Sequence, residues 1–557
     1  MRLLINNKKL RSIIICIVSG ALIGLSFPPF NAWFLVYFGI TILIFQILTS
    51  TKAKQLLSRS YLSMLIFNAI TLYWIGGWSS DDIFLKIGGV ATVLVHPLFF
   101  LLPVILTYLI AKIFRPQLAL ISFPFIWTGF EYAHNEGQLA FPWIELGNTE
   151  TYNLNRIQYI DFTGVHGITF LICLVSVLIY YLILNIYSGR WQLRSNRTIG
   201  LAAIIIILII APNIYSYIYF NTVDPEKYLS TSGSSSLIRT TIIQPNVDPF
   251  KKWKGDRNVL VDSYIKKLNE SLVFNPDFIV LHETAVPYYF LEEYNYDQTK
   301  KFLDFVNYDK KILLMGIPHL QYFDDSTRAP KDSKIMSRSK RRYGTYNSAI
   351  LIEPDKNLSE MQIHKKVKLV PISEHTPYQD VFPFLQNLVS WGVGISSWQA
   401  GDELKIFEIN DPESGIKTKF ASLICFESVF SDYVSEAVKR DAEFLVIITN
   451  DGWFGKSSGP IQHRQFAVLR AIENRKWIVR AAQTGISCFI DPIGNTYDKI
   501  PAFTEGIVTK EIITNHEKTF YSIHGDIIGK VSYWAALSGF LFSVIVFGVR
   551  RSRKRNK

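Results

Sequence analysis

The sequence predicts a two-part protein, in which a multi-pass α-helical membrane region is joined to a layered α/β domain. Apolar residues make up 49% of the 557 residues and the mean hydropathy is +0.18, which is high for an ordinary soluble protein. Charged residues make up 19%, which is too many for a membrane bundle alone. We therefore expect a membrane domain of about seven transmembrane helices at 1–225, an α/β domain at 236–513, and a last transmembrane helix with a basic tail at 527–557.

Eight apolar runs form the expected membrane helices. A helix needs roughly 20 residues to cross a bilayer core, with a range of about 17–25, and the second and fifth runs are short by that standard. The first run could by itself be a signal peptide, but no cleavage site is obvious and more apolar runs follow, so we expect a retained helix. The runs are 12–27, 33–48, 60–75, 87–113, 118–130, 164–186, 199–217 and 531–549.

The charges of the connecting loops predict the orientation. Basic residues gather before the first run, in every second loop after it, and after the last run, whereas the other loops are neutral or acidic. Because basic loops stay in the cytoplasm, this alternation predicts cytoplasmic termini and an outer face for 236–513. The net charge of +12 sits largely at these flanks, so it does not indicate a nucleic-acid partner. In the outer loop 131–161, Trp143 is interpreted either as an interfacial anchor or as part of a lipid entrance.

Within the α/β domain, short β-branched runs alternate with helical stretches. Strands are expected at 240–244, 278–281, 312–316, 348–352, 421–424, 444–449 and 487–490. Amphipathic helices between several of them indicate layers of helix and sheet. The basic stretch 331–342 is interpreted as a solvated hairpin tip, with attraction to anionic lipid headgroups as the alternative.

Each of three reactive side chains stands at one end of such a run. Glu283 follows 278–281, Lys366 begins a second run, and Cys425 follows the run that ends at Ile424. Ligands bind at the carboxyl edge of α/β sheets, so we expect a carboxylate, an ammonium and a thiol to meet there. Glu283 could accept the thiol proton and Lys366 could stabilise an oxyanion. Taken alone, a lone cysteine is more often a small buried residue, and no spacing rule places the three together.

The remaining cysteines and histidines predict neither a cofactor nor a metal. Cys16 and Cys173 lie in apolar runs, and with Cys425 and Cys488 they make no disulfide framework or zinc pattern. His463 could pair with Cys425, although a structural role is the plainer interpretation. Four charged residues at the end of the domain are expected to form structural ion pairs: Arg470, Glu473, Arg475 and Arg480.

Several segments carry a family resemblance. The surroundings of Glu283, Lys366 and Cys425 resemble the nitrilase, or carbon–nitrogen hydrolase, superfamily, whose members use a Glu–Lys–Cys triad. Over nearly its full length the chain resembles the apolipoprotein N-acyltransferase family. The other matching motifs are Phe27-Pro28-Pro29-Phe30, Phe141-Pro142-Trp143, Ile243-Gln244-Pro245-Asn246 with Trp253 beyond, Tyr346-Asn347-Ser348-Ala349, Asn450-Asp451-Gly452-Trp453-Phe454-Gly455, Gln462-His463 and Thr484-Gly485-Ile486-Ser487. The chain departs from the family pattern at three positions, none of them in the triad: His282 in place of proline, Ser373 in place of glycine and Phe426 in place of tyrosine.

The resemblance implies a fold and a reaction. It implies a four-layer αββα sandwich and transfer of an acyl chain from a phospholipid, chiefly phosphatidylethanolamine, through a Cys425 thioester. The acceptor would be the α-amino group of the N-terminal diacylglyceryl-cysteine of an apolipoprotein, in the last step of lipoprotein maturation, at the periplasmic face of a bacterial inner membrane. The residues that match positions around the active site are Trp253, Glu374, Phe426, Glu427 and Trp453.

Three of these matching positions carry more specific expectations. Trp253 and Phe426 would line an acyl or headgroup pocket. Glu374 would orient Lys366 or hold a charged headgroup or amine, although a plain turn residue is an equal alternative.

Two other classes of function stay open on the residues alone. A membrane-tethered amidase that hydrolyses a small amide would use the same Glu–Lys–Cys groups, but it would not need eight spans. A catalytically silent lipid-binding scaffold would not need the intact triad. We expect the acyltransferase reaction.

Overall fold

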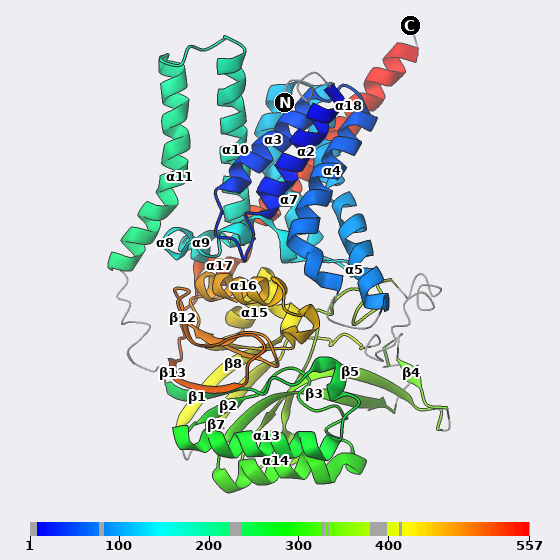
Figure 1. Ribbon diagram of the computed structural model, residues 1–557, viewed down its shortest axis with the longest axis vertical. Coiled ribbons are helices and arrows are strands. Elements are labelled where there is room, and N and C mark those ends of the chain that lie inside the picture. Colours follow the sequence, from blue (N-terminus) through cyan, green and yellow to red (C-terminus); the bar gives the residue numbers. More distant parts are fainter. Residues whose placement is uncertain are drawn as a thin grey trace. The chain divides into compact units, whose positions relative to one another are not determined.

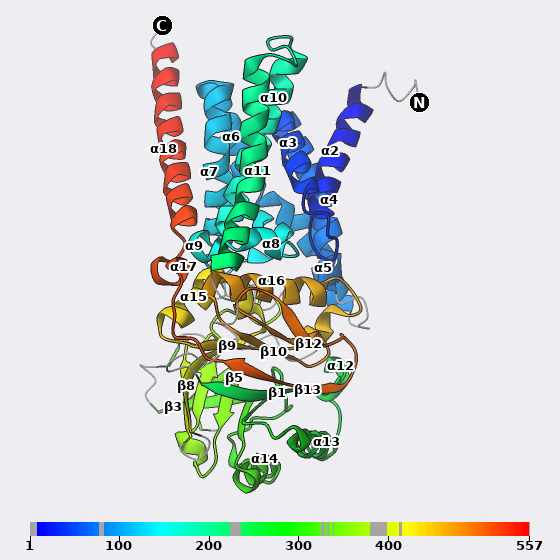
Figure 2. The ribbon, with the colours of Figure 1, turned by 90° about the vertical axis from the view of Figure 1, so that its left-hand side faces the viewer.

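The computed structural model describes residues 8–76, 83–222, 236–324, 329–330, 333–337, 339–378, 398–411 and 415–555 (Figures 1 and 2). These residues form two compact units. One is helical and holds 8–76, 86–222 and 524–555. The other holds chiefly 236–523 and contains the β-sheets.

Each of the eight apolar runs contains helix, and the fourth is divided in two by a short 3₁₀ turn at His96–Leu98. Pro97 lies in this turn, where it fits because its ring fixes φ and removes a hydrogen-bond donor. The long helices are α2 (Lys8–Gly24), α3 (Leu35–Thr49), α4 (Ala53–Leu72), α5 (Ile83–Val95), α6 (Leu101–Ile113), α7 (Pro116–His134), α10 (Val165–Tyr187), α11 (Asn196–Thr222) and α18 (Ile527–Arg555). Two short helices, α8 (Leu154–Ile157) and α9 (Ile160–Thr163), precede α10.

Four stretches of the described helices are long and apolar enough to cross a membrane. They are Leu85–Ile113, Val165–Tyr187, Asn196–Thr222 and Ile527–Arg550. Leu35–Thr49 is apolar but shorter, as its sequence predicted. The apolar residues of Asn196–Thr222 and Ile527–Arg550 are largely exposed, which suits helices that face lipid. The count of eight crossings stays a prediction.

Trp143 lies inside the helical unit. Its side chain is buried, and its ring centroid is 4.9 Å from that of Trp74. The segment after Trp143 is held by Glu131 of α7, which accepts hydrogen bonds from the Leu146 N–H at 3.0 Å and from the Thr169 hydroxyl at 2.7 Å. The buried side chain does not fit an anchor that faces lipid, and a part in a lipid entrance stays a prediction.

The α/β unit contains two sheets. One has the order β13-β1-β2-β3-β5-β4 with β6 beside β5, and the other has the order β12-β11-β10-β9-β8-β7. Each is parallel at its centre, in β1-β2-β3 and in β8-β9-β10, and antiparallel at its edges. The strands are β1 (Leu237–Gln244), β2 (Phe278–Val280), β3 (Ile312–Phe323), β4 (Lys334–Ile335), β5 (Arg342–Ile352), β6 (Gln362–Lys365), β7 (Ile406–Asp411), β8 (Ile416–Ile424), β9 (Phe444–Thr449), β10 (Ile478–Ala482), β11 (Ser487–Ile490), β12 (Thr496–Ile500) and β13 (Gly506–Ile513).

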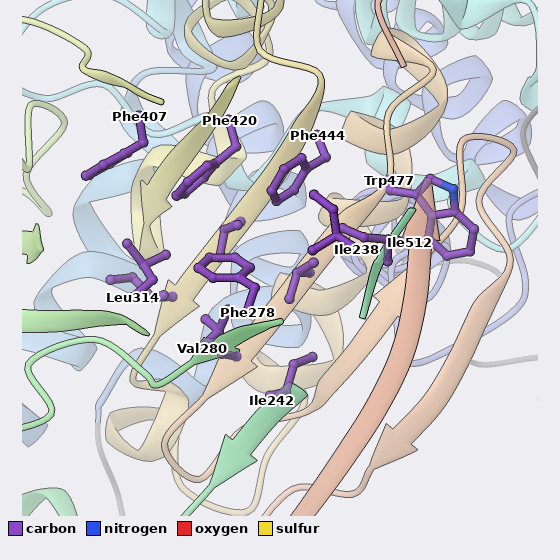
Figure 3. Packing of buried hydrophobic residues seen from close by; sticks show 14 of the residues in the cluster. Ile238, Ile242, Phe278, Val280, Leu314, Phe407, Phe420, Phe444, Trp477 and Ile512 are labelled. Atoms are coloured by element: carbon purple, nitrogen blue, oxygen red, sulfur yellow. The ribbon is translucent and has the colours of Figure 1, made fainter. Parts of the chain in front are cut away.

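Alternation along each strand explains why the two sheets pack face to face. Phe278 and Val280 of β2 point into a core shared with Phe420 and Phe444 of the other sheet, as Figure 3 shows. The ring centroids of Phe278 and Phe420 are 5.4 Å apart. Ile279, which lies between Phe278 and Val280, points to the opposite face of the sheet and belongs to a second core there. Because both faces of the central strands are covered, these strands read as continuous apolar runs.

Helices cover the outer face of each sheet. α13 (Arg257–Ser271) and α14 (Tyr296–Asp309) pack on the sheet that contains β2 (Figure 1). α15 (Ser431–Lys439) and α16 (Gly459–Asn474) lie against the sheet that contains β8 (Figure 2). The expected αββα sandwich is therefore confirmed, and each of the seven expected strands is present. Two further helices are short: α12 (Pro249–Lys252) follows β1 in the chain, and α17 (Phe520–His524) follows β13.

The basic stretch 331–342 forms part of a hairpin. Lys334 and Ile335 make β4, which pairs antiparallel with β5. The Arg342 guanidinium donates to the Ser333 hydroxyl at 2.9 Å, and Arg341 forms an ion pair with Asp324. Lys331 and Arg338 lie outside the described residues, and attraction to lipid headgroups stays a hypothesis.

Candidate active site

The turn after β2 presents Glu283. The chain leaves β2 through Leu281 and His282, and Thr284 takes a left-handed backbone with φ of 44°. Gly316 of β3 lies so close that a Cβ there would come within 2.6 Å of the Glu283 Cα, so only glycine permits this approach. The Ala285 N–H donates to the Gly316 carbonyl at 2.7 Å, which fixes the turn against β3.

His282 holds the same turn from behind. Its Nδ1 lies 2.9 Å from the Glu283 carbonyl oxygen and its Nε2 lies 2.9 Å from the Tyr264 hydroxyl. Burial, together with the nearby charge of Lys252, lowers the pKa of His282 well below its usual value. The ring is therefore neutral, with Nδ1 as the donor to the carbonyl. The proline that the family pattern has at this position offers no side-chain donor. His282 therefore stabilises the turn by a hydrogen bond that proline could not make.

Lys366 enters the site from the end of β6. Its backbone N–H donates to the Asn347 carbonyl of β5 at 2.8 Å, and its carbonyl accepts from the Gly401 N–H at 2.8 Å. The side chain is fully buried, and its ammonium donates to Glu283 at 3.3 Å and to Glu374 at 2.8 Å. Of the alternatives for Glu374, the structure therefore favours the one in which it orients Lys366.

Cys425 comes from the other sheet. It follows β8 and opens a 3₁₀ turn, Cys425–Val429, with a left-handed φ of 53°. The sequence predicted three strand ends at one sheet edge. The structure instead brings the ends of β2 and β6 in one sheet together with the end of β8 in the other. The sandwich core explains this, because it places the two parallel centres face to face.

Three donors surround the carboxylate of Glu283. Its Oε1 accepts from the Asn347 amide at 2.7 Å as well as from Lys366, and its Oε2 accepts from the Asn450 N–H at 2.9 Å. These donors come from β5, β6 and the end of β9. They fix both carboxylate oxygens, so Glu283 has little freedom to rotate.

The charges of these groups act on one another. Burial raises the pKa of the Cys425 thiol, and the Glu283 carboxylate raises it further, while the Lys366 ammonium lowers it. Burial alone lowers the pKa of Lys366, but Glu283 and Glu374 more than offset this and raise it, so the ammonium keeps its proton. Cys425 is therefore a protonated thiol at rest, and Glu283, Lys366 and Asp451 are the charged groups that act on its pKa.

Known proteins match this chain along nearly its whole length. A family model for the apolipoprotein N-acyltransferase N-terminal domain matches residues 19–178, and a carbon-nitrogen hydrolase model matches residues 239–516. The apolipoprotein N-acyltransferase of Chlorobaculum tepidum is 30% identical over 524 residues, which cover 92% of this chain and 93% of that protein. This chain belongs to the apolipoprotein N-acyltransferase family.

A second relative supports the family membership. The apolipoprotein N-acyltransferase of Geobacter metallireducens is 29% identical over 540 residues, covering 95% of this chain and 94% of that protein. Among solved structures, Saccharomyces cerevisiae Nit3, a member of branch 10 of the nitrilase superfamily, is similar with a TM-score of 0.36 and 16% identity, over 51% of this chain and 93% of that one. As a member of the apolipoprotein N-acyltransferase family, the chain is an acyltransferase, and its apolar helices suit a membrane enzyme.

In this family member, Glu427 joins the cysteine turn to the lysine segment. Its carboxylate is fully buried and accepts from the Ile424 N–H at 2.8 Å, the Val367 N–H at 2.6 Å and the Tyr433 hydroxyl at 3.0 Å. His364 lies 3.1 Å away as an ion-pair partner. Burial alone would raise the pKa of Glu427, but these partners lower it. Glu427 therefore links the turn that begins at Cys425 to the segment that follows Lys366.

His463 supports the backbone of Cys425 and not its thiol. Its Nε2 lies 3.2 Å from the Cys425 carbonyl oxygen and 3.1 Å from the Ser428 hydroxyl, and its Nδ1 lies 2.8 Å from Asp451. Arg480 donates to the other oxygen of Asp451 at 2.8 Å. This geometry fits a structural role for His463 better than a pairing of its ring with the Cys425 thiol. The ion pairs expected for Arg470 with Glu473, at 2.6 Å, and for Arg480 are present.

The three aromatic candidates lie in different surroundings. Phe426 is buried, with its ring 5.1 Å from that of Phe430. Trp453 is half-buried against Phe250 at 5.0 Å. Trp253 is half-buried, with the Lys252 ammonium 5.8 Å from its ring centroid.

Sequence reasoning assigned no role to several residues that hold the triad. Asn347 and Asn450 contact Glu283, and His364 contacts Glu427. The first two lie in segments that were noted for their motif, and a polar residue inside an apolar strand is the signal that could have found Asn347. Among the described residues no group of three His, Cys, Asp or Glu side chains is arranged to hold a metal ion.

Proposed function

We propose that the chain transfers an acyl chain from a phospholipid to the α-amino group of the N-terminal diacylglyceryl-cysteine of an apolipoprotein. The observation that carries this proposal is the contact of Glu283 with Lys366 beside a Cys425 thiol of raised pKa, in a chain that matches its family across both units. Family membership supports a lipoprotein acceptor and a lipid donor. Phosphatidylethanolamine as the chief donor is part of the proposal.

The first half-reaction loads Cys425. Glu283 accepts the thiol proton as the sulfur attacks the ester carbonyl carbon of the donor. A tetrahedral intermediate forms and then collapses, the C–O ester bond breaks, and the alkoxide of the lysophospholipid leaves with the proton from Glu283. Cys425 then carries the acyl chain as a thioester.

The second half-reaction unloads it. The α-amino nitrogen of the acceptor attacks the thioester carbonyl, and Glu283 accepts a proton from that nitrogen. The C–S bond breaks, an amide forms, and the proton returns to the sulfur of Cys425. In both halves the Lys366 ammonium stabilises the oxyanion, with the backbone N–H of Phe426 as a second donor.

The two Glu374 contacts explain how Lys366 is kept ready for this task. Glu374 accepts from the Lys366 ammonium at 2.8 Å and from the Val370 N–H at 2.8 Å. The Lys366 side chain is therefore held between two carboxylates and keeps its charge while Glu283 changes protonation. Glu374 is a positioning residue in this scheme.

An amidase that hydrolyses a small amide would use the same triad. The match to the family's N-terminal domain over residues 19–178 favours lipid substrates instead, since a small amide needs no membrane region. A silent scaffold would not need Glu283 fixed by three donors. Acyl transfer is the function that these observations favour together.

We also propose that the α/β unit faces the periplasm and both termini face the cytoplasm of the inner membrane. The alternating basic loops support this orientation. Labelling of a single cysteine introduced at Lys334 should succeed with a membrane-impermeant reagent on intact spheroplasts, and labelling of one introduced at Lys54 should require lysis. The reverse pattern would overturn the orientation.

The reaction is tested by mass spectrometry of the full-length protein incubated with phospholipid and no acceptor. Wild type should accumulate an acyl thioester on Cys425, whereas Cys425→Ala and Glu283→Gln should not. Lys366→Ala should form it about 10²–10³ times more slowly, the usual cost of losing an oxyanion donor. Ala in place of Cys16, Cys173 or Cys488 should leave the signal intact. Strong acyl-enzyme in Glu283→Gln would mean that another group activates the thiol.

A further inference from the structure

A second buried ammonium lies beside the Glu283 turn, and the mechanism above does not use it. Lys252 is the last residue of α12 and its side chain is almost fully buried. It donates to the Thr284 carbonyl at 2.5 Å, to the Thr284 hydroxyl at 3.2 Å and to the Gln483 side-chain oxygen at 2.7 Å. All three acceptors are neutral, which is unusual because a buried charge normally has a charged partner.

These contacts join two segments that hold Glu283. Thr284 follows Glu283 directly and has the left-handed backbone that aims it. The Gln483 N–H donates to the Thr449 carbonyl at 3.0 Å, and the residue after Thr449 supplies the N–H that binds Glu283. Lys252 thus connects the turn that carries the base to the strand end that carries one of its donors.

Lys252 also completes the charge balance of the site. Glu283 and Glu374 bring two carboxylates, and Lys366 brings one ammonium. A charged Lys252 supplies the second positive charge. Burial lowers the pKa of Lys252 to about 7, against the opposing effect of Glu283, so the charge of this residue changes near neutral pH.

We propose that Lys252 is a positioning residue for Glu283 whose charge also eases the loss of the Cys425 proton. The inference rests on the proposed role of Glu283 as the base. Lys252 and Glu283 act on each other electrostatically, and the Glu283 charge raises the pKa of Cys425. Removal of the positive charge leaves the surroundings of the thiol more negative, which opposes its ionisation. Without that charge, Cys425 should therefore react more slowly.

Two titratable groups from the β2 turn face Lys252. The Glu283 carboxylate favours the charged form of Lys252, and the His282 ring is neutral. On the other side, the end of β10 contributes the neutral amide of Gln483, and the Trp253 ring lies on the helix side. Of Lys252 and His282, Lys252 is the group whose pKa lies near neutral pH.

The test measures the rate of Cys425 alkylation by iodoacetamide in the full-length detergent-solubilised protein across a range of pH, with the modified peptide identified by mass spectrometry. Lys252→Gln keeps a polar side chain without the charge. Below pH 7 it should react about tenfold more slowly than wild type, which corresponds to a thiol pKa raised by one unit. Above pH 7 the two rates should converge, because wild-type Lys252 has then lost its own proton.

The matched control is Lys251→Gln, since Lys251 is exposed and lies one residue away. Its profile should follow that of wild type. A Lys252→Gln profile that equals wild type, or one lowered by the same factor at every pH, would overturn the electrostatic role. If the thermal unfolding curve shows that Lys252→Gln does not fold, Lys252→Arg is used in its place. Lys252→Arg keeps the charge and does not lose it near neutral pH, so it should stay faster than wild type above pH 7, and convergence there would overturn the proposal.

Alkylation needs neither phospholipid nor apolipoprotein. A wild type that forms no thioester but still shows the Lys252-dependent profile would reject the proposed reaction and keep this inference. If wild type forms the thioester and Lys252→Gln behaves as Lys251→Gln does, the proposed reaction is kept and the inference about Lys252 is rejected.

Discussion

Two buried clusters of charged residues in the α/β unit shift the pKa of a carboxylate in opposite directions. In the supporting cluster, formed by Asp451, His463 and Arg480, burial alone would raise the pKa of Asp451, but Arg480 and His463 lower it strongly. In the reactive cluster, formed by Glu283, Lys366, Glu374 and Lys252, burial and the Glu283 charge raise the pKa of Glu374 despite Lys366. The first cluster therefore stabilises the charged state of Asp451, whereas the second opposes ionisation of Glu374.

The difference follows from the charges that surround Asp451 and Glu374. Asp451 receives the Thr449 hydroxyl at 2.8 Å, one His463 nitrogen and the Arg480 guanidinium. Two carboxylates of the reactive cluster share the single ammonium of Lys366. Because the ammonium is shared, the Glu283 charge opposes ionisation of Glu374. We infer that the supporting cluster contributes stability and the reactive cluster contributes function.

The largest expected effect breaks the supporting cluster. Asp451→Asn removes the charge that Arg480 and His463 face while keeping the shape of the side chain. Removing one partner of a buried ion pair typically costs about 3–5 kcal/mol, so the free energy of unfolding should fall by about that amount. Denaturant unfolding in detergent, followed by tryptophan fluorescence, measures it. An unchanged unfolding midpoint would show that the cluster does not support the fold.

A smaller effect is expected from the reactive cluster. Glu374→Gln keeps the acceptor for Lys366 but removes a charge, so the Lys366 ammonium is held less firmly. Acyl-enzyme formation should slow about tenfold, which is less than the loss of the oxyanion donor itself. The free energy of unfolding should stay within about 1 kcal/mol, because a shared buried charge has been removed. Glu403→Gln, at an exposed position, is the control. A large loss of stability in Glu374→Gln would erase the contrast between the clusters.

The pH dependence of stability gives the smallest and most direct comparison. The folded pKa of Asp451 is lowered, so its contribution is complete above its unfolded pKa of about 3.9 and is lost as the pH falls through the folded value. Glu374 acts in the opposite sense, since its raised pKa costs stability as the pH rises above about 4.3. Wild type should therefore lose stability below about pH 4 more steeply than Asp451→Asn. Equal acid profiles for the two proteins would contradict the assignment.

Much of the architecture could be predicted from local patterns. The apolar runs predicted helices at all eight positions, and the runs at 278–281 and 444–449 predicted buried central strands, because burial on both faces leaves a continuous apolar signature. Six strands lie outside the seven expected ranges: β4, β6, β7, β10, β12 and β13. All of these except β10 lie at the sheet edges and carry polar residues on one or both faces, so their sequences resemble loops.

For the site, the sequence by itself singled out Glu283, Lys366 and Cys425, and it placed Glu283 and Cys425 at the ends of strands. Lys366 was expected to open a run of its own, but it follows β6 instead. Only the tertiary structure decided that they come from two sheets, that Glu374 pairs with Lys366, and that Lys252 lies behind the base. The physical reason is the length of the chain between partners. Asn450 and Glu283 are 167 residues apart, and Lys252 and Gln483 are 231 apart. A periodic pattern records which face of its own strand a residue occupies, whereas contacts across such separations are set by how two sheets pack on one core.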